Sequence, residues 1–339
     1  MLRLVGVLVT VVGAIVAAAL TFPGVFSVGR FWPVAQVVSF RGLLAAGFAA
    51  ATLFLLLLAV ARPLRTMALT LALVTALAAG ANVAMLMTRG LGTESLPAKS
   101  DASIRVMTWN TAGEATTADT VAKIAVAMDA DIVALPETTI ATGEQVAIAM
   151  RELGHPMWAH HVDNPSTQWD AGSTTLLITP DLGDYAVIEA SQDGTSNTST
   201  VPSAVAMPTS GDGPIVVAAH AVAPRQAYMS YWRSDLQWLA DQCADANVIL
   251  AGDFNATLDH MAGLGVDGGT LGRCHDIAAE TGNGAVGTWT TAIPALLGAP
   301  IDHVMATTHW RPTGSIVLRS LDGSGSDHRP LIVQLEPVG

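Results

Sequence analysis

The sequence predicts an α/β protein in which two packed β-sheets are flanked by helices and preceded by three transmembrane helices. Three observations lead to this prediction. The first hundred residues are largely apolar. After residue 103, helix-like segments alternate with strand-like ones, and the strand-like segments outnumber the helical ones. Several of these strands are apolar throughout, which is typical of sheets covered on both faces. A simple doubly wound sheet fits so many strands poorly.

The charge of the chain changes sharply near residue 100. Residues 1–100 contain seven basic residues and one acidic residue, a net charge of +6. The remainder contains nine basic and 27 acidic residues, a net charge of −18. The two parts are therefore expected to occupy different solvents.

Three apolar stretches are long enough to cross a bilayer, which takes about 20 residues. They are Leu4–Phe22, Leu43–Ala61 and Met67–Met87. The first stretch alone could be a cleaved signal peptide, but two further stretches follow it directly. A buried helical core is disfavoured because no polar face recurs along the three stretches.

The basic residues of the short loops predict the topology. Arg3 precedes the first span, and Arg62 and Arg65 lie between the second and third spans, so all three belong on the cytoplasmic side. We therefore expect a multi-pass protein of the cell membrane whose acidic C-terminal part is extracytoplasmic. Arg30, Arg41, Arg89 and Lys99 count against this orientation.

The predicted organisation has three parts: a membrane domain at 1–88, a linker at 89–103 and a catalytic domain at 104–339. Helices are expected at 117–128, 143–153 and 231–242, the last capped by Ser230 or Ser234. Ser191–Ser203 is rich in small polar residues and predicts a surface loop. Strands are expected, in order, at 104–109, 131–135, 173–179, 185–190, 203–207, 214–219, 247–251, 301–306, 315–321 and 330–335.

The two cysteines are Cys243 and Cys274. In an oxidising exterior they would form one disulfide. Two buried thiols are nearly as consistent with the sequence, which does not give their separation in space.

Short polar motifs follow the apolar strands, and the strongest is Gly252-Asp253-Phe254-Asn255. Residues i and i+2 of extended backbone share a face, so the Asp253 carboxylate and the Asn255 amide point the same way. Gly252 is expected to let a ligand approach the backbone closely. Taken alone, the motif could equally be an ordinary turn after a strand.

Glu137 and Asn110 end two other strands. Hard cations such as Mg²⁺ take oxygen ligands, commonly one or two carboxylates together with substrate phosphate. Glu137 is therefore a candidate ligand, although a single carboxylate at the start of a loop is common. Asn110 could simply form a turn.

Histidine and aspartate residues complete the set of motifs. Asp327 is a candidate metal ligand, and His328 a candidate base because histidine titrates near neutral pH. Asp302 could hold His328 in its productive tautomer, the role of the acid in a catalytic triad. His220 could bind a phosphate oxygen or protonate a leaving group, although a lone histidine at a strand end is more often structural.

Taken together, the ordered motifs resemble the endonuclease/exonuclease/phosphatase superfamily, whose best-known member is deoxyribonuclease I. The resemblance covers residues 104–336 and rests on Trp-Asn, Leu-Pro-Glu, His-Ala-Val-Ala-Pro, Gly-Asp-Phe-Asn, Thr-Trp, Ile-Asp-His-Val and Ser-Asp-His-Arg-Pro. It implies a four-layer α/β sandwich and a phosphoesterase that uses Mg²⁺ or Mn²⁺.

The resemblance also implies roles for single residues. Glu137 is the principal metal ligand, with Asn110 and Asp327 nearby. Asp253 and Asn255 position the attacking water and the phosphate. His328 and Asp302 form the pair that supplies the general base, and His220 acts toward the leaving group. The division of labour between Asp253 and His328 stays open, and Trp289 is expected to shape the site.

The chain departs from the family pattern in two ways. Pro136 stands where the family usually has Gln, which would alter the surroundings of Glu137 without removing a ligand. The aromatic and basic residues with which nucleases of the family grip DNA are not identifiable in the sequence.

The charge of the outer domain favours a substrate other than nucleic acid. Proteins that bind DNA neutralise several phosphates with Lys or Arg, and residues 101–339 carry −18. We therefore expect the partners to be the lipid bilayer and a phosphate ester of a lipid or lipid-linked headgroup. Alternatives are a membrane-tethered nuclease, a non-catalytic binding domain and a transporter; protein partners are unknown.

Overall fold

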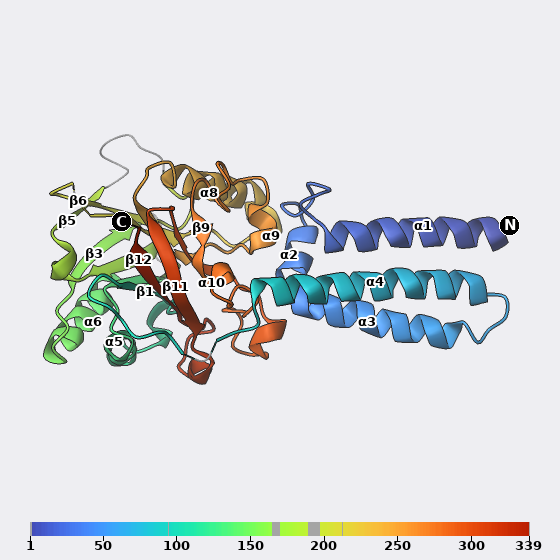
Figure 1. Cartoon of the computed structure of the whole chain (residues 1–339), viewed down its shortest axis with the longest axis horizontal. Helices are drawn as coiled ribbons and strands as arrows, with labels where there is room; N and C mark the ends of the chain where they lie inside the picture. Colours follow the sequence, from blue (N-terminus) through green and yellow to red (C-terminus); the bar gives the residue numbers. More distant parts are fainter. Residues whose placement is uncertain (1, 94, 165–169, 189–196, 212, 339) are drawn as a thin grey trace.

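The computed structural model describes residues 2–338 apart from 94, 165–169, 189–196 and 212. A bundle of long helices projects from one end of a C-terminal α/β domain (Figure 1). The three long helices are α1 (Leu2–Thr21), α3 (Arg41–Leu58) and α4 (Arg65–Arg89), and the short α2 (Val34–Ser39) precedes α3. Each long helix is apolar and long enough to cross a membrane.

The order of the helices places their ends on two sides. The chain starts at the far end of the bundle, and the turn between α3 and α4 lies there too (Figure 1). The α1–α3 connection and the end of α4 meet the C-terminal domain. Arg62 and Arg65 therefore lie away from that domain, as the predicted topology requires.

The first sheet has six strands in the order β11-β12-β1-β2-β4-β3. β1 is parallel to β2 and antiparallel to β12. The bounds are β1 (Ile104–Thr108), β2 (Ile132–Pro136), β3 (Trp158–Asp163), β4 (Ser173–Ile178), β11 (Trp310–Val317) and β12 (Leu331–Pro337).

The second sheet also has six strands, in the order β5-β6-β7-β8-β10-β9. β7 is parallel to β8, and β10 is antiparallel to β8. The bounds are β5 (Tyr185–Ile188), β6 (Ala204–Pro208), β7 (Ile215–His220), β8 (Val248–Asp253), β9 (His275–Asp276) and β10 (Asp302–Ala306).

Three apolar clusters define four layers, which confirms the predicted sandwich. One cluster lies between the sheets and includes Val106, Ile132, Val216 and Ile249. A second packs the first sheet against α5 (Ala118–Ala127) and α6 (Ile140–Glu152). A third packs the second sheet against α8 (Met229–Gln242). Alternate residues of each central strand thus enter different clusters, which explains why the strands are apolar throughout.

Short elements complete the domain. Among the described residues they are α9 (Leu258–Met261), α10 (Ile277–Glu280) and the 3₁₀ turns η1 (Gly113–Ala115), η2 (Asp170–Gly172), η3 (Pro180–Leu182), η4 (Gln226–Tyr228), η5 (Ala295–Leu297) and η6 (Arg319–Leu321).

The structure corrects several predictions. The strands β3 and β9 and the helices α2, α9 and α10 were missed, because each is short or lacks an apolar period. β11 begins at Trp310 rather than residue 315, since Arg311 and Pro312 break the apolar run. α8 begins at Met229 without a side-chain cap, so neither Ser230 nor Ser234 caps it. The structure describes only 197–203 of the predicted loop at 191–203.

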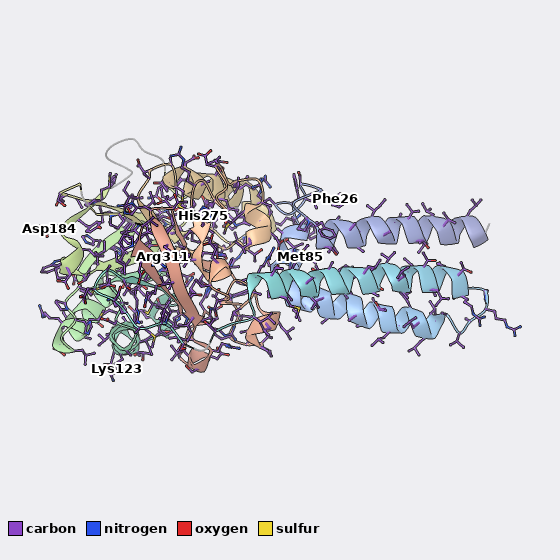
Figure 2. The ribbon with its side chains drawn as sticks, viewed as in Figure 1. Phe26, Met85, Lys123, Asp184, His275 and Arg311 are labelled. Atoms are coloured by element: carbon purple, nitrogen blue, oxygen red, sulfur yellow. A yellow bond between two sulfur atoms is a disulfide. The ribbon has the colours of Figure 1, made fainter. Side chains whose placement is uncertain are left out.

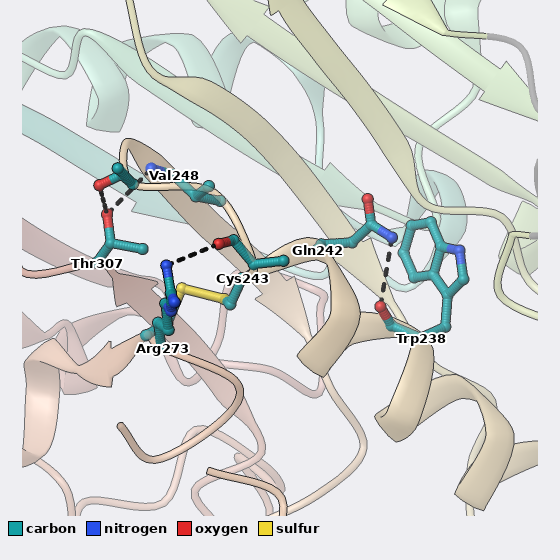
Figure 3. Close-up of a disulfide and its surroundings, with 9 residues drawn as sticks. Trp238, Gln242, Cys243, Val248, Arg273 and Thr307 are labelled. Atoms are coloured by element: carbon teal, nitrogen blue, oxygen red, sulfur yellow. Dashed lines mark hydrogen bonds between the residues drawn. A yellow bond between two sulfur atoms is a disulfide. The ribbon is translucent and has the colours of Figure 1, made fainter. Parts of the chain in front are cut away.

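Cys243 and Cys274 form a disulfide, with their Cα atoms 5.6 Å apart (Figure 3). The bond ties the end of α8 to the segment before β9, and both cysteines are fully buried. Of the two alternatives that the sequence leaves open, the disulfide is therefore the one observed.

The N-terminal helices are joined to the C-terminal domain by a cluster of buried charges. Arg41 donates to both carboxylate oxygens of Asp259, at 2.6 and 3.0 Å, and Arg89 donates to the same two oxygens at 2.8 and 2.9 Å. Arg41 also donates to Asn82 of α4 and to the Thr21 carbonyl of α1. One carboxylate therefore holds the ends of all three helices.

The segment predicted as a linker lies against the C-terminal domain. Gly92 N–H donates to the Gly282 carbonyl, and Lys99 pairs with Asp131 at 2.8 Å. The Gly284 N–H donates to the Arg89 carbonyl. These bonds continue the junction beyond the end of α4.

Candidate active site

The sheet topology brings the polar strand ends to one edge of the sandwich. Asn110, Glu137, His220 and Asp253 lie at or just after the carboxyl ends of β1, β2, β7 and β8. Asp302 begins β10, which runs antiparallel to β8, so Asp302 lies directly opposite Asp253. His328 precedes β12, which runs antiparallel to β1, and therefore reaches the same edge.

Asp253 is the centre of the hydrogen-bond network. Its Oδ1 accepts from the Asn255 backbone N–H at 2.8 Å, and its Oδ2 accepts from the amides of Asn110 and Asn255 at 3.1 and 3.2 Å. The side chain is buried. Burial and the nearby Asp302 charge raise the pKa of Asp253, with His328 and the amide donors opposing the shift.

Asp302 and His328 form the pair that the sequence predicts. His328 Nδ1 donates to Asp302 Oδ2 at 2.8 Å, and both residues are buried. His328 Nε2 lies 3.9 Å from Asp253 Oδ2 and 3.9 Å from Asp327 Oδ1. Burial acts to lower the pKa of His328, but Asp302 and the two other carboxylates outweigh it and raise the pKa.

Glu137 and Asn110 are in direct contact. Asn110 Nδ2 lies 3.1 Å from Glu137 Oε1 and also bonds Asp253, so this one amide joins the two carboxylates. Glu137 and Asn255 both adopt left-handed backbone conformations, with φ of 57° and 47°. Non-glycine residues in this region carry strain, which is concentrated at functional sites.

Asp327 approaches the cluster from the loop before β12. Its Oδ2 accepts from Trp289 Nε1 at 2.8 Å, and its side chain is half exposed. Trp289 thus orients Asp327, which is a more specific role than the shaping role expected of Trp289.

His220 lies behind Glu137 rather than in the open part of the site. Its Nε2 is 3.8 Å from Glu137 Oε1, and within the described chain its buried Nδ1 has no hydrogen-bond partner. Burial, followed by the charge of His328, lowers the pKa of His220 to about 3, so the imidazole is neutral at physiological pH.

A cavity of about 680 Å³ opens over these residues, which is within the range of small-molecule sites. Glu137, Asp253, Asn255, Asp327 and His328 line it, together with Trp289. Its remaining lining includes Arg225 and four residues of the α1–α3 connection: Trp32, Gln36, Ser39 and Phe40. Sequence reasoning missed these five residues, since nothing local distinguishes an aromatic residue near a membrane span from one that lines a site.

Two further residues hold the site together. Ser326 Oγ donates to the Asn110 carbonyl at 2.7 Å and accepts from the His328 N–H at 2.9 Å. Arg329 is fully buried and binds Asp322 together with the carbonyls of Gly287, Thr290 and Ile293. Their place within the Ser-Asp-His-Arg-Pro motif was the available signal.

Gly252 is required by the packing of two neighbouring strands. A Cβ at this position would lie 1.9 Å from the Ala219 carbonyl oxygen. Ala219 is its partner in the parallel β7–β8 pair. The glycine therefore permits close approach of a neighbouring strand, which places His220 beside Asp253.

Comparison with known proteins identifies the sequence pattern and the fold. The sequence model described as "Endonuclease/Exonuclease/phosphatase family" matches residues 107–328. No curated protein matches the chain.

Several solved structures share the fold at low sequence identity. An endonuclease/exonuclease/phosphatase from Beutenbergia cavernae is 20% identical, with 70% of this chain and 72% of that chain covered and a TM-score of 0.51. D. rerio TDP2, complexed with a single-strand DNA product, is 16% identical, covers 70% of this chain and 100% of its own, and has a TM-score of 0.51. The AP endonuclease LMAP from Leishmania major is 16% identical, with coverages of 75% and 95% and a TM-score of 0.52.

Proposed function

The chain belongs to the endonuclease/exonuclease/phosphatase family, whose members are metal-dependent phosphoric ester hydrolases, and we propose that it hydrolyses a phosphate ester of a lipid or lipid-linked headgroup by in-line attack of water. The observation that carries the reaction is the convergence of Asn110, Glu137, Asp253, Asp302 and His328 at one sheet edge. These residues come from distant parts of the chain and lie in or directly beside one cavity.

The residues beside the cavity fit a hard divalent cation. Glu137 and Asp327 line the cavity, and the only hydrogen bond that Glu137 accepts through its carboxylate within the described chain is the one from Asn110. Carboxylate and amide oxygens are the donors that Mg²⁺ and Mn²⁺ prefer. When bound, such a cation would neutralise charge that develops on the phosphoryl and leaving-group oxygens.

A second group of potential ligands is less suitable. Asp253, Asp302 and His328 offer atoms within 4.8 Å of one another. However, His328 Nδ1 and Asp302 Oδ2 are already bonded to each other. The Glu137 side of the cavity is therefore the better cation site.

The geometry favours Asp253 as the proton acceptor. A general base works best with a pKa near the operating pH, and burial raises the pKa of Asp253 toward that range. The raised pKa of His328 makes it a cation. His328 Nε2 is then a donor to the attacking water or to a phosphoryl oxygen, held in position by Asp302.

Asn255 and His220 act through other residues. The Asn255 amide donates to the Ala221 carbonyl and to Asp253, so it positions the base. His220 stands next to Glu137 as a neutral imidazole, with Nε2 3.8 Å from Oε1, so it acts on the site through its packing against that carboxylate. This assignment replaces contact of His220 with the leaving group.

Charge and tethering support the lipid substrate. Residues 101–339 carry a net charge of −18, which disfavours nonspecific binding to nucleic acid. Three helices able to cross a membrane would hold the cavity at the bilayer surface. We further place the domain outside the cytoplasm, in accord with Arg62 and Arg65 at the far end of the bundle and with the disulfide.

A membrane-tethered nuclease is the second candidate. It is favoured by the structural relatives, since one is complexed with a DNA product and another is an AP endonuclease. Hydrolysis of membrane lipid extract and of plasmid DNA, each with Mg²⁺ or Mn²⁺, separates the two candidates. DNA cleavage with intact lipids would refute the lipid proposal.

The reaction is tested by substitution of the two central residues. Asp253→Ala and His328→Ala should each lower hydrolysis of bis(p-nitrophenyl) phosphate by about 10²–10⁴-fold, because proton transfer and its electrostatic support are lost. Asp267→Ala is the control, since Asp267 is exposed and pairs only with Arg273 in the described chain. Activity equal to the wild type in both site variants would overturn the assignment of these residues. A wild-type protein that does not hydrolyse the substrate would overturn the proposed reaction.

A further inference from the structure

The cavity has a wall that does not belong to the family domain. Trp32, Gln36, Ser39 and Phe40 come from the connection between α1 and α3, yet they line the same space as Asp253 and His328. The family match begins only at residue 107. The N-terminal helices therefore contribute directly to the surroundings of the reacting group.

This wall is fixed to the catalytic residues. The ring of Phe40 lies 5.7 Å from the ring of Trp289, and Trp289 in turn donates to Asp327. The next residue, Arg41, is held by Asp259. The cavity thus keeps its wall through both an aromatic contact and a buried ion pair.

A second set of contacts joins the wall to the loop after β7 and to α9. Gln36 Nε2 donates to the Pro224 carbonyl, and the Ala35 carbonyl lies 3.0 Å from His260 Nε2. Gln36 Oε1 is buried and, among the residues that the structure describes, has no partner.

Arg225 follows Pro224 and supplies the cavity with a positive charge. It is the only Arg or Lys among the described lining residues, and no ion pair to it is recorded in the described parts of the chain. Guanidinium groups bind phosphate and carboxylate groups through paired hydrogen bonds. An exposed Arg that lines the cavity without an ion-pair partner among the described residues is therefore suited to an anionic headgroup.

The same connection carries an exposed aromatic surface. Phe22, Phe26, Phe31 and Trp32 are 42–56% exposed, and Figure 2 shows Phe26 near the end of α1 that meets the C-terminal domain. Tryptophan and other aromatic residues favour the boundary between hydrocarbon and water. Trp32 both lines the cavity and belongs to this surface, so the cavity borders the expected bilayer boundary.

We propose that Trp32, Gln36, Phe40 and Arg225 form a headgroup subsite, which binds an anionic phospholipid that remains in the bilayer while its phosphate ester enters the cavity. The proposal rests on the proposed function and specifies how the lipid is recognised. The aromatic wall contacts the part of the lipid nearest the hydrocarbon, and Arg225 binds the anionic headgroup.

The test measures competition against a soluble substrate. The full-length protein is placed in nanodiscs of phosphatidylcholine, with or without phosphatidic acid, and hydrolysis of bis(p-nitrophenyl) phosphate is followed with Mn²⁺. Phosphatidic acid should raise the KM of the soluble ester and leave kcat unchanged. Glycerol 3-phosphate, which offers the same phosphate without a lipid, should compete only at much higher concentration.

Substitutions then locate the subsite. Trp32→Ala and Arg225→Ala should each weaken competition by phosphatidic acid about tenfold, which corresponds to about 1.4 kcal/mol. Trp32→Phe and Arg225→Lys should restore part of it. Phe26→Ala is the matched aromatic control, and Arg311→Ala, at an exposed pair with Glu336, is the matched cation control (Figure 2).

The outcomes separate the two proposals. Absence of wild-type hydrolysis refutes the proposed function itself. Hydrolysis with no competition by phosphatidic acid beyond that of phosphatidylcholine overturns the subsite, and so does equal competition in variants whose unfolding midpoints match the wild type. Stronger competition by a single-stranded oligonucleotide than by phosphatidic acid also overturns it and favours nucleic acid.

Discussion

At the scale of residues, Asp253, Asp302 and His328 form a buried cluster with two carboxylates and one imidazole. Because His328 Nδ1 is bonded to Asp302, the proton on Nε2 faces Asp253 and Asp327. A cation in this position compensates the two buried carboxylates, which would otherwise repel each other. We therefore propose that Asp302 holds His328 charged and oriented.

Replacement of Asp302 tests this role. Asp302→Asn should lower kcat by about 10²-fold or more with a small change in KM, because the imidazole loses its orienting carboxylate. The control is Asp276→Asn, which disrupts another buried histidine–aspartate pair, that with His303. Loss of activity per folded molecule in the control alone would contradict the role of Asp302.

At the scale of elements, the close pairing of β7 and β8 positions the site. The two parallel strands place His220 opposite Asp253. Glycine at 252 allows this pairing, because any Cβ there would collide with the backbone of β7. The motif Gly-Asp-Phe-Asn thus combines a packing requirement in its first residue with the proposed base in its second and a residue that positions this base in its fourth.

A single methyl group should disturb this pairing. Gly252→Ala is expected to destabilise the protein by about 1–3 kcal/mol, the usual cost of overpacking a core. It should also lower activity, because the added methyl group would push His220 and Asp253 apart. Gly323→Ala is the control, since no atom lies within 4 Å of its added Cβ. Thermal unfolding in detergent measures both, and equal midpoints would contradict the packing argument.

At the scale of the whole molecule, Asp259 joins the N-terminal helices to the C-terminal domain. Burial by itself would raise the pKa of Asp259, but the hydrogen bonds and charges of Arg89 and Arg41 outweigh it and hold the pKa well below its usual range. A lowered folded-state pKa means that the ionised carboxylate stabilises the folded state. This contribution is complete above the unfolded pKa and is lost as the pH falls toward the folded one.

Acid should therefore loosen the junction. The contribution of Asp259 to stability should be constant from neutral pH to about pH 5 and should fall progressively below about pH 4, where the unfolded carboxyl group is protonated. Asp259→Asn should cost about 3–5 kcal/mol at pH 7, because two guanidinium groups lose a buried partner.

The measurement is the unfolding midpoint of the full-length protein in detergent as a function of pH. In Asp259→Asn the acid-dependent loss should be smaller than in the wild type. Asp267→Asn is the control, because its pair with Arg273 is exposed and such pairs contribute little. An Asp259→Asn midpoint equal to that of the control would refute the role of the junction.

Much of the fold and the site followed from local patterns in the sequence. Apolar runs ending in Asn110, Glu137 and Asp253 predict strands with polar ends, and three long apolar stretches predict the long helices. These patterns are local because strand and helix periods are set within a few residues. The pairing of Asp302 with His328 was expected from the chemistry of catalytic triads and from the family resemblance, and the structure places His328 Nδ1 2.8 Å from Asp302 Oδ2.

The parts that the sequence did not reveal depend on distant segments. The choice of disulfide over free thiols, the bond of Arg41 and Arg89 to Asp259, and the meeting of Trp32 and Phe40 with the active-site cavity each join residues far apart in the chain. No local period encodes such contacts, since they arise only when packed layers bring strand ends and helix ends to one edge. The sequence by itself determined the class of reaction and the three long apolar helices. The tertiary structure decided that the motif residues and the connection between α1 and α3 line one cavity.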